Sequence, residues 1–504
     1  MKQVGKKLSV LLKDCSAEGL KSGRDPIVTR LAIDSRRVTP GTVFFALPGL
    51  KSDGNAFVSE AISRGAVAVV SDRSTKLGNP KVAYARVKNP RAALAKAAKA
   101  FFEAPDETLK ITGITGTNGK TTVSHLIQHL LSGEGRKVGC LGTIGYDLVE
   151  RALPSFRTTP EAHDLYELLS QMRGFGCTGA AMEVSSIGID QLRVNEMSFD
   201  AVVFLNLTRD HLDYHGEMEE YYQVKKRLFA GELGQKPRVA VVNSDDEYGR
   251  RLIEELGDEG NLVSFGMHGD AMIRADVVEL GPSGASFELV WPEGRVDVKS
   301  SLIGRYNVSN LLASFAVCYA SGLDLKDCVK RLISFEGIPG RMERVPHKGN
   351  FQVVVDYAHT ADALQNALSM LRDVTPNRLH LVFGCGGDRD RGKRREMTSA
   401  ALELSDTCWA TADNPRREPL DQIFEDMKEG VVDDRDAGRI AFVQDRRRAI
   451  ELALKSANEG DCVLIAGKGH ETFQEFGETV VPFDDRKVAF ELLELIELGG
   501  RSIE

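Results

Sequence analysis

The stretch "ITGITGTNGKTTV", Ile111 to Val123, determines how the rest of this chain is interpreted. β-branched and apolar residues precede the glycines, as in a buried strand, and after them Val123, Leu126 and Ile127 begin an apolar repeat at helical spacing. The segment therefore predicts a strand, a glycine-rich turn and a helix. In such a unit the free N–H groups at the start of the helix cradle an anion, and the lysine contacts the outer phosphates.

The loop departs from the strict phosphate-loop pattern at one position. That pattern requires a glycine five residues before Gly119, where this chain has Ile114. A glycine-rich turn with an exposed lysine is the alternative interpretation. The strand, the spacing, the Lys-Thr pair and the helix together favour a nucleoside triphosphate site, in which Lys120 reaches the outer phosphates and Thr121 or Thr122 offers a hydroxyl to magnesium.

Composition limits the classes of protein that fit. The chain has 504 residues, more than one core usually serves, so two to four domains are expected. A net charge of −8 argues against a nucleic-acid partner. Eight cysteines without a CxxC pattern indicate neither a disulfide framework nor a zinc site. Reduced thiols in the cytoplasm fit this pattern best. No apolar stretch approaches membrane-spanning length, so we expect no insertion into membranes. We also expect a monomer.

The pattern of strands and helices predicts three α/β domains: a small N-terminal domain (1–106), a central phosphate-loop ATPase domain (107–341) and a Rossmann-like C-terminal domain (342–504). Strands and helices alternate through the central part, which implies a mostly parallel sheet covered on both faces. The segment "FEGIPGRMERV" (335–345) is interpreted as a hinge. After it, each apolar strand runs into a polar or glycine-rich loop, and ligands bind at such strand ends.

Acidic and imidazole side chains follow two predicted strands of the central domain. Glu183 ends one strand, and Asp210, His211, Asp213 and His215 come just after another. A carboxylate and an imidazole there could meet magnesium or the γ-phosphate. Taken singly, these residues are equally consistent with a structural glutamate and an ordinary polar turn.

His125 and His129 form an i, i+4 pair on the phosphate-loop helix. We interpret them as a solvated polar face and not as a metal site, because no glutamate companion is present. The short strings "GCGG" (384–387) and "GKGH" (467–470) are too common to indicate a nucleotide site on their own.

Ten motifs in register make the chain resemble a known family, the Mur ligases, which build the peptide stem of bacterial cell-wall precursors. Their order is that of the branch that adds a diamino acid, and the resemblance covers nearly the whole chain. The motifs are "TGTNGKTT" (115–122), "EVSS" (183–186), "NLTRDHLDYHG" (206–216), "YYQVKKRLF" (221–229), "GRYNVSNLLA" (304–313), "GIPGRME" (337–343), "DYAHT" (356–360), "GCGGDRDRGKR" (384–394), "DNPR" (413–416) and "GKGHE" (467–471).

The resemblance implies an ATP-dependent, magnesium-requiring amide ligase of peptidoglycan precursor synthesis. ATP would phosphorylate the terminal carboxylate of UDP-N-acetylmuramoyl-L-alanyl-D-glutamate, and an amine of meso-2,6-diaminopimelate would attack the acyl phosphate. Converting a carboxylate into a mixed anhydride splits one difficult step into two easier ones.

The resemblance also implies roles for individual residues around ATP and the metal. Lys120, Lys225 and His211 would be catalytic. The metal ligands would be Thr121, Glu183, His211 and Lys225. The ATP-binding residues would be Gly116, Thr117, Asn118, Gly119, Lys120, Thr121, Thr122, Asn307, Asn310, Arg341, Asp356 and His359.

Lys225 falls where the family carries a carbamylated lysine. A free ammonium would repel a metal ion, whereas a carbamate is an anion that resembles a carboxylate. Lys226 follows directly, and Tyr221 and Phe229 fix the register in favour of Lys225.

For the two substrates the resemblance implies two further sets of residues. The UDP-sugar-peptide set is Ile33, Ser35, the loop 49–54, Thr158, Thr159, Ser185, Gln191 and Arg193. The diaminopimelate set is Arg389, Asp413, Asn414, Pro415, Arg416, Gly467 and Glu471. Arg389 and Arg416 favour an amino acid with a second carboxylate, because guanidinium groups bind carboxylates in a fork geometry and the distal end of lysine is an ammonium.

Three positions depart from the family pattern. Ile187 replaces a histidine, Arg157 an asparagine and Ala361 a proline. The first two lie near the expected nucleotide-sugar site, and the third lies near the hinge. None removes a phosphate or metal ligand.

Two rival interpretations remain at this point. Folylpolyglutamate synthetases and other Mur ligases share the phosphate loop and the three-domain plan, although "DNPR" after "GCGGDRD" favours the diaminopimelate-adding branch. A nucleotide-gated regulator without ligase activity would have little need for Lys225, Arg389 and Arg416 together. Phosphate release that requires both substrates would exclude the regulator.

Overall fold

The computed structural model describes residues 5–18, 24–49, 52–73, 81–133, 135–257, 261–281 and 283–500. The chain divides into two compact units, each described by itself. Unit 1 comprises Met1–Arg274 and Asn310–Arg331, and unit 2 comprises Ala275–Ser309 and Leu332–Glu504. Within the described ranges, no helix is both long enough and apolar enough to cross a membrane.

The N-terminal part of unit 1 is a small parallel sheet whose strands alternate between two cores. Val43 and Phe45 belong to the main core of the unit, while Phe44 packs in a smaller one with Val58 and Ala61. This alternation follows from the two-residue period of a strand. The strands, in order, are β3 (Arg30–Ala32), β4 (Thr42–Phe45), β5 (Ala66–Ser71) and β6 (Ala83–Arg86), the helices are α1 (Leu8–Leu11), α2 (Val58–Ser63) and α3 (Pro90–Phe101), and β1 (Lys6–Lys7) pairs with β2 (Ile27–Val28).

The strand that leads into the phosphate loop lies in the middle of the larger sheet of unit 1. This strand, β7 (Lys110–Thr115), is parallel to β11 (Gly179–Glu183) on one side and to β12 (Ala201–Phe204) on the other. Ile111 and Ile114 are fully buried in it. Because all three strands are parallel, their carboxyl ends meet at one edge, and the phosphate loop, Glu183 and the "NLTRDH" segment emerge there together.

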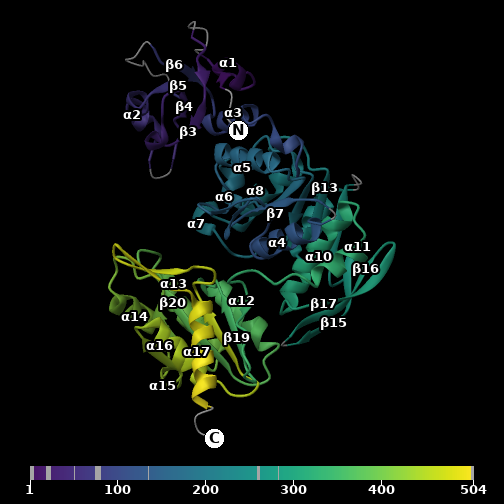
Figure 1. Ribbon diagram of the computed structural model, residues 1–504, viewed down its shortest axis with the longest axis vertical. Coiled ribbons are helices and arrows are strands. Elements are labelled where there is room, and N and C mark those ends of the chain that lie inside the picture. Colours follow the sequence, from purple (N-terminus) through teal and green to yellow (C-terminus); the bar gives the residue numbers. More distant parts are fainter. Residues whose placement is uncertain are drawn as a thin grey trace. The chain divides into compact units, whose positions relative to one another are not determined.

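The other elements of this region flank that centre (Figure 1). The strand order in unit 1 is β10-β9-β8-β11-β7-β12-β13-β14. The strands are β8 (Val138–Leu141), β9 (Gly145–Asp147), β10 (Ala152–Pro154), β13 (Val239–Asn243) and β14 (Leu262–Gly266), and the helices are α4 (Lys120–Leu131), α5 (Ala162–Gly174), α6 (Ser186–Asp190), α7 (Leu212–His215), α8 (Met218–Ala230), α9 (Glu247–Leu256), α10 (Arg305–Ala320) from Asn310 on and α11 (Leu325–Leu332) up to Arg331.

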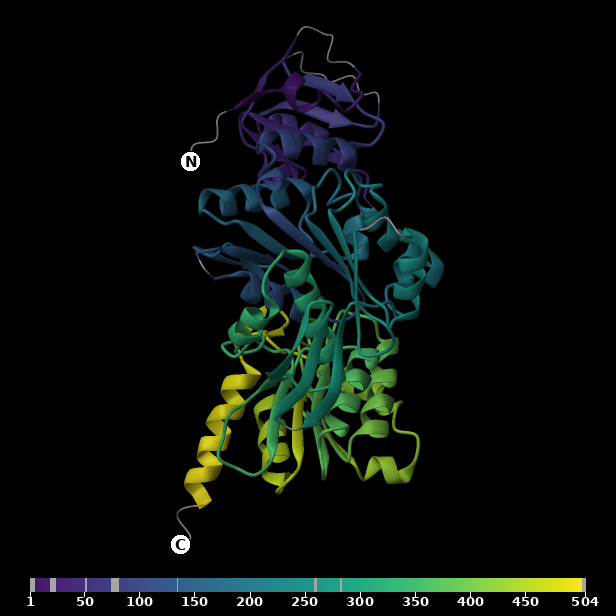
Figure 2. The same ribbon diagram turned by 90° about the vertical axis from the view of Figure 1, so that its right-hand side faces the viewer.

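Unit 2 is built on a six-stranded sheet with the order β18-β19-β23-β20-β21-β22, in which β18 alone is antiparallel. Successive residues of its strands face opposite cores. In β23 (Cys462–Ala466), Leu464 packs with α12 (Ala361–Arg372), α13 (Gly392–Leu404) and α14 (Leu420–Lys428), whereas Val463 and Ile465 pack with α16 (Arg446–Ser456) and α17 (Asp485–Gly500). The sheet is thus covered on both faces (Figure 1), and α17 is the yellow helix that leads to the C-terminus in Figure 2.

The bounds of these elements are as follows. The strands are β18 (Glu343–Arg344), β19 (Gln352–Asp356), β20 (Leu379–Cys385), β21 (Thr407–Ala412), β22 (Ile440–Val443) and β23 (Cys462–Ala466), and the helices are α12 (Ala361–Arg372), α13 (Gly392–Leu404), α14 (Leu420–Lys428), α15 (Asp434–Ala437), α16 (Arg446–Ser456) and α17 (Asp485–Gly500). Unit 2 also contains β15 (Ile273–Gly281) from Ala275 on, β16 (Gly284–Trp291), β17 (Gly294–Ser300), and the hairpin of β24 (Phe473–Phe476) and β25 (Thr479–Pro482).

The predicted α/β class with mostly parallel sheets is confirmed. The predicted domain boundaries after 106 and 341 stay predictions. Leu50 and Lys51 of the predicted substrate loop 49–54 lie outside the described residues, as does the side chain of Asp213.

Candidate active site

The phosphate loop joins β7 to α4, and a glycine is required at its end. Gly119 has φ of 88°, a left-handed conformation that side chains rarely adopt. A Cβ atom at this position would also come within 2.4 Å of Asn310 Oδ1. The predicted glycine-rich turn is therefore packed closely against a residue that the resemblance assigns to ATP.

An asparagine from the end of β12 holds the loop in place. Asn206 Oδ1 accepts hydrogen bonds from the backbone N–H groups of Thr117 (3.0 Å) and Asn118 (2.9 Å), and Asn206 Nδ2 donates to the Asn118 carbonyl (3.1 Å). Thr117 Oγ1 in turn donates to the Thr208 carbonyl at 3.2 Å. In the sequence Asn206 is only one residue of the motif "NLTRDHLDYHG", and its position as an amide just after a central strand is the one indication of its role.

Two lysines converge on one carbonyl of the loop. Lys120 Nζ donates to the Gly116 carbonyl at 2.8 Å, and Lys225 Nζ donates to the same oxygen at 3.2 Å. Lys225 is 1% exposed, and its Nζ lies 4.6 Å from the centre of the Tyr221 ring. Burial, and then the neighbouring Lys120, hold the pKa of Lys225 well below its ordinary value. The structure thus favours a neutral amine at this position.

Glu183 ends β11 beside the loop. Its side chain is buried, Oε1 accepts from the Thr143 N–H at 2.8 Å, and Oε2 accepts from Thr143 Oγ1 at 3.0 Å. A buried carboxylate oriented by a backbone N–H and a hydroxyl is a suitable oxygen ligand for magnesium. Thr143 was not singled out from the sequence.

The "RDHLDYHG" segment divides into two roles. His211 stands at the start of α7 in a left-handed conformation (φ 54°) and is partly exposed, with Nε2 3.5 Å from Asp210 Oδ2. His215 is buried, its Nε2 lies 2.9 Å from Ser186 Oγ, and its ring stacks on Tyr221 at 5.0 Å. Burial lowers the pKa of His215. The sequence grouped both histidines with the metal chemistry, but the contacts of His215 are those of a packing residue.

The interpretation of His125 and His129 as solvated surface was wrong. Both rings are half-buried, His125 Nδ1 donates to the Thr121 carbonyl at 2.9 Å, and His129 Nε2 donates to the Arg331 carbonyl at 2.8 Å. They brace the helix and its neighbour.

Most of the residues predicted for the nucleotide-sugar peptide form one connected group. Thr159 Oγ1 donates to the Glu183 carbonyl at 3.0 Å and lies 3.1 Å from Ser185 Oγ. Arg193 donates to the Thr159 carbonyl at 3.1 Å and to Gln191 Oε1 at 2.6 Å. Thr158, also predicted, joins the group through Thr143: its Oγ1 lies 3.1 Å from Thr143 Oγ1, which donates to Glu183.

The two N-terminal members of this predicted set lie in the small sheet region of unit 1. Ser35 is buried and donates to Glu60 Oε2 at 2.7 Å, and Ile33 packs partly buried against the main core. The structure gives them local partners.

Two of the family departures have structural explanations. Arg157 pairs with Glu161 at 2.9 Å, and Arg91 (3.4 Å) and Arg193 (3.2 Å) pair with the same buried carboxylate. Three guanidinium groups around one carboxylate leave excess positive charge beside the threonines. Ala361 is the first residue of α12, where proline is often used because its N–H is not needed. Nothing in the structure explains Ile187.

The loops after β20, β21 and β23 bring the predicted amino-acid-binding residues of unit 2 together. Asn414 Nδ2 donates to Glu471 Oε2 at 2.9 Å. Arg416 Nη1 donates to the Gly387 carbonyl at 2.9 Å, and its Nε pairs with Glu475 Oε2 at 2.8 Å. The other predicted members are the buried Asp413 and Pro415, Gly467, and the exposed Arg389. The β24–β25 hairpin, which the sequence pattern did not predict, adds Glu475 and Gln474, whose Nε2 donates to the Asp413 carbonyl at 3.0 Å.

Three more residues predicted to contact ATP, Arg341, Asp356 and His359, belong to unit 2. The Arg341 guanidinium lies 4.7 Å from the centre of the Tyr357 ring, and Asp356 accepts from the N–H groups of Met342 and Ala358, both at 2.8 Å. Burial raises the pKa of Asp356. His359 Nδ1 donates to the Tyr357 carbonyl at 2.8 Å, and burial lowers the pKa of that imidazole.

One further ATP-set residue, Asn307, donates through Nδ2 to the Ile303 carbonyl at 2.8 Å. This bond reaches back four residues, to the segment just before α10, and fixes the orientation of the amide at the start of the helix.

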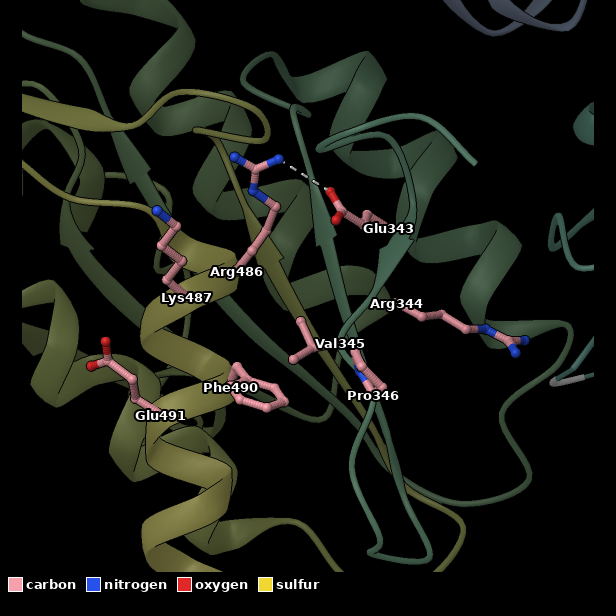
Figure 3. A pocket seen from close by; sticks show the side chains of 8 residues that line it. All are labelled: Glu343, Arg344, Val345, Pro346, Arg486, Lys487, Phe490 and Glu491. Carbon is pink, nitrogen blue, oxygen red and sulfur yellow. Dashed lines mark ion pairs between the residues drawn. The ribbon is translucent and has the colours of Figure 1, made fainter. Parts of the chain in front are cut away.

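A cavity of about 320 Å³ lies elsewhere in unit 2, between α17 and the segment 343–346 (Figure 3). Figure 3 shows Phe490 and Val345 at its centre and Arg486 pointing toward Glu343, with which it pairs at 3.5 Å. None of the predicted site residues lines it, and its walls carry both charge signs. We assign it no ligand.

A phosphate loop on a parallel sheet, with a buried lysine and a carboxylate at the same edge, is the site of an enzyme that uses a nucleoside triphosphate. Three family models match in succession: Mur ligase family, catalytic domain (residues 27–102), Mur ligase middle domain (114–318) and Mur ligase, glutamate ligase domain (340–469). The chain belongs to the Mur ligase family.

Individual relatives resemble the chain from end to end. It is 46% identical over 470 residues to the UDP-N-acetylmuramoyl-L-alanyl-D-glutamate--2,6-diaminopimelate ligase of Solibacter usitatus (92% of this chain, 93% of the relative). It is 41% identical over 488 residues to the ligase of the same name from Geobacillus thermodenitrificans (96% and 98%). A solved structure of a ligase of that name matches with a TM-score of 0.67 at 35% identity, covering 94% of this chain and 96% of that one.

Proposed function

We propose that this protein is an ATP-dependent ligase of the MurE type, which joins meso-2,6-diaminopimelate to the D-glutamate of UDP-N-acetylmuramoyl-L-alanyl-D-glutamate in peptidoglycan precursor synthesis. The observation that carries the proposal is the end-to-end similarity to ligases of that name, with 46% identity over 92% of this chain in one case. The reaction forms an amide through an acyl phosphate, with ADP and phosphate as products.

The phosphate loop would hold ATP through backbone N–H groups and Lys120. Lys120 Nζ now donates to the carbonyls of Gly116 and Thr117, both at 2.8 Å, so its ammonium already lies over the loop. The γ-phosphate can replace these neutral acceptors with charged oxygens, which bind an ammonium more strongly. The substrate carboxylate then attacks the γ-phosphorus, and ADP leaves.

The donors at the strand ends fit magnesium if Lys225 is carbamylated. Glu183, the Thr121 hydroxyl and the imidazole of His211 would hold the ion together with the carbamate, and the bound ion would neutralise charge on the transferring phosphoryl group. As an ammonium, Lys225 would oppose a cation. The lowered pKa of Lys225 supports the carbamate, because only the neutral amine reacts with carbon dioxide.

The amino-acid site would bind both the carboxylate and the ammonium at the distal end of diaminopimelate. The Arg416 guanidinium supplies a fork for a carboxylate, with exposed Arg389 available as a second cation, and Glu471 supplies an anion for the ammonium. Lysine offers no distal carboxylate, so it would form no ion pair with the Arg416 guanidinium, which would keep only its contacts to Gly387 and Glu475.

The location, oligomeric state and domain boundaries of the protein are part of the same proposal. A cytoplasmic location is supported by the use of ATP and by eight cysteines that are all free thiols. We also propose that the protein is a monomer with domain boundaries near 106 and 341; the matched family segments end or begin close to these positions.

Phosphate release tests the proposed function directly. The purified protein is incubated with ATP, magnesium and UDP-N-acetylmuramoyl-L-alanyl-D-glutamate, with meso-diaminopimelate, L-lysine or no amino acid. We expect multiple turnovers with diaminopimelate only. Release with lysine alone would retain the ligase and contradict the carboxylate pocket, and no release with any amine would contradict the function.

The loop clamp gives a second test. Replacing Asn206 by alanine removes three hydrogen bonds from the loop, so we expect KM for ATP to rise at least about 10-fold, since each net bond contributes roughly 0.5–1.5 kcal/mol. Steady-state kinetics and calorimetric ADP binding measure the change. The control is Asn261→Ala, which replaces an exposed asparagine of the same unit and should leave KM for ATP unchanged. Unchanged ADP affinity in Asn206→Ala would show that the clamp does not shape the site.

A further inference from the structure

A lysine lies fully buried beneath the predicted amino-acid site. Lys468 has no exposed side-chain surface, and its Nζ donates to Glu471 Oε2 at 3.0 Å, to Asn414 Oδ1 at 3.1 Å and to Asp413 Oδ1 at 3.3 Å. All three partners belong to the set predicted to bind diaminopimelate. The resemblance assigns no role to Lys468 itself.

The contacts of this lysine fix how its partners are oriented. Glu471 Oε2 accepts from both Lys468 Nζ and Asn414 Nδ2, and Asn414 Oδ1 accepts from Lys468 Nζ and from the backbone N–H of Glu475 at 3.1 Å. The Asn414 amide is therefore fixed in one orientation. The carboxylate of Glu471 is held through one oxygen, which determines the direction of the other.

The backbone that carries Lys468 is itself anchored. Arg446 and Asp485 are both fully buried and form a paired contact, Nε to Oδ1 and Nη2 to Oδ2, each 2.7 Å long. Arg446 Nη2 also donates to the carbonyl of Ala466 at 2.9 Å, two residues before Lys468. A rigid support of this kind is what a preorganised binding group requires.

The charges explain why an ammonium belongs here. Asp413 and Glu471 would place two negative charges around one small site, and removing two like charges from water without a counterion is costly. Among these three side chains one ammonium leaves a single negative charge for the ammonium of a distal amino acid group, and the buried Arg446 interacts with both carboxylates from its pair with Asp485. An uncharged residue at 468 would leave both carboxylates without the ammonium that they contact directly.

We propose that Lys468 is a positioning residue for amine-substrate recognition: it holds Glu471 and Asn414 so that Glu471 receives the distal ammonium of the amino acid. It acts through these side chains and does not touch the substrate. The inference rests on the proposed function and deepens it at the amino-acid site.

The test separates the two substrates kinetically. In Lys468→Met we expect KM for diaminopimelate to rise about 20-fold, a loss typical of a hydrogen bond to a charged group, while KM for ATP changes by less than about twofold. Lys455→Met, which removes an exposed lysine paired with Glu451 on α16, is the matched control and should leave both KM values unchanged. A folded Lys468→Met protein with an unchanged KM for diaminopimelate, or with equal losses for both substrates, would overturn the inference.

A double-mutant cycle tests whether Lys468 acts through Glu471. If it does, Lys468→Gln combined with Glu471→Gln should raise KM for diaminopimelate no further than Glu471→Gln alone, because contacting residues are not additive. Full additivity would reduce Lys468 to a structural role and overturn the inference. Lys468→Gln keeps a hydrogen-bond donor at this position, so it replaces Lys468→Met in the kinetic test if the methionine variant does not fold.

The activity of the unaltered protein distinguishes a failure of this inference from a failure of the proposed function. The unaltered protein must first release phosphate only when diaminopimelate and the nucleotide-sugar peptide are both present. Without that activity the proposed function fails, whereas with it the Lys468 variants decide the inference alone.

Discussion

Replacing Lys225 by glutamine is expected to lower kcat about 10³-fold with little change in ATP affinity, on the order of 4 kcal/mol of transition-state stabilisation. Lys225 is buried against the loop carbonyl of Gly116 and beside Lys120, where a permanent cation is disfavoured. Glutamine removes the anion that the carbamate would supply. Phosphate release under saturating substrates measures kcat, and ADP binding measures affinity.

Lys226→Gln is the matched control for this prediction. Lys226 adjoins Lys225 in α8 but pairs with Glu255 at 2.9 Å and is partly exposed. We expect near-normal activity in this variant. A severe loss in Lys226→Gln with an active Lys225→Gln would move the catalytic position by one residue and contradict the assignment.

The carbamate can also be observed directly. Because burial and Lys120 lower the pKa of Lys225, a larger fraction of the amine is neutral near pH 7 than for an exposed lysine, and that fraction grows as pH rises. Carbon-13 NMR with labelled bicarbonate should give a protein-bound carbamate signal that weakens as pH falls. The same signal in Lys225→Gln would exclude Lys225 as its source.

The second large effect is expected at Arg416. Arg416→Ala should lower kcat/KM for diaminopimelate about 10²-fold, because a charged hydrogen-bonded pair contributes roughly 1.5–3 kcal/mol, while KM for ATP stays unchanged. The guanidinium is held by the Gly387 carbonyl and by Glu475, so its fork has a defined direction. Competition between diaminopimelate and lysine measures the accompanying loss of selectivity.

The neighbouring Arg417 provides the control for this substitution. Arg417 is exposed, and Arg417→Ala should behave like the unaltered protein. If Arg416→Ala weakened the use of ATP as much as that of diaminopimelate, the carboxylate assignment would be wrong and the change would have disturbed the fold of the site.

Local sequence patterns predicted the elements that carry the site. The strand, turn and helix around "GTNGKTT" are found as β7, the loop and α4, and Ile114, which breaks the strict glycine pattern, is a buried residue of β7 paired with Glu183 and Val203 in the neighbouring strands. The α/β class and the Mur ligase family are confirmed. The roles of individual site residues stay predictions until the variants are measured.

Contacts between distant residues could not be predicted from spacing. Asn206 clamps a loop about 89 positions earlier in the chain, and His215 packs against Ser186 although the sequence grouped it with His211. Period and composition report which face of an element is buried, but they do not report which polar side chain meets which partner.

The sequence by itself determined the α/β class, the nucleotide loop and the family, because these depend on short motifs and on hydrophobic periodicity, which can be recognised in one sequence. Only the tertiary structure decided that Lys225 is a buried amine with a depressed pKa and that Lys468 joins Asp413, Asn414 and Glu471. The physical reason is that burial and charge pairing arise from residues brought together by parallel strands ending at one edge, and those residues lie far apart in the chain.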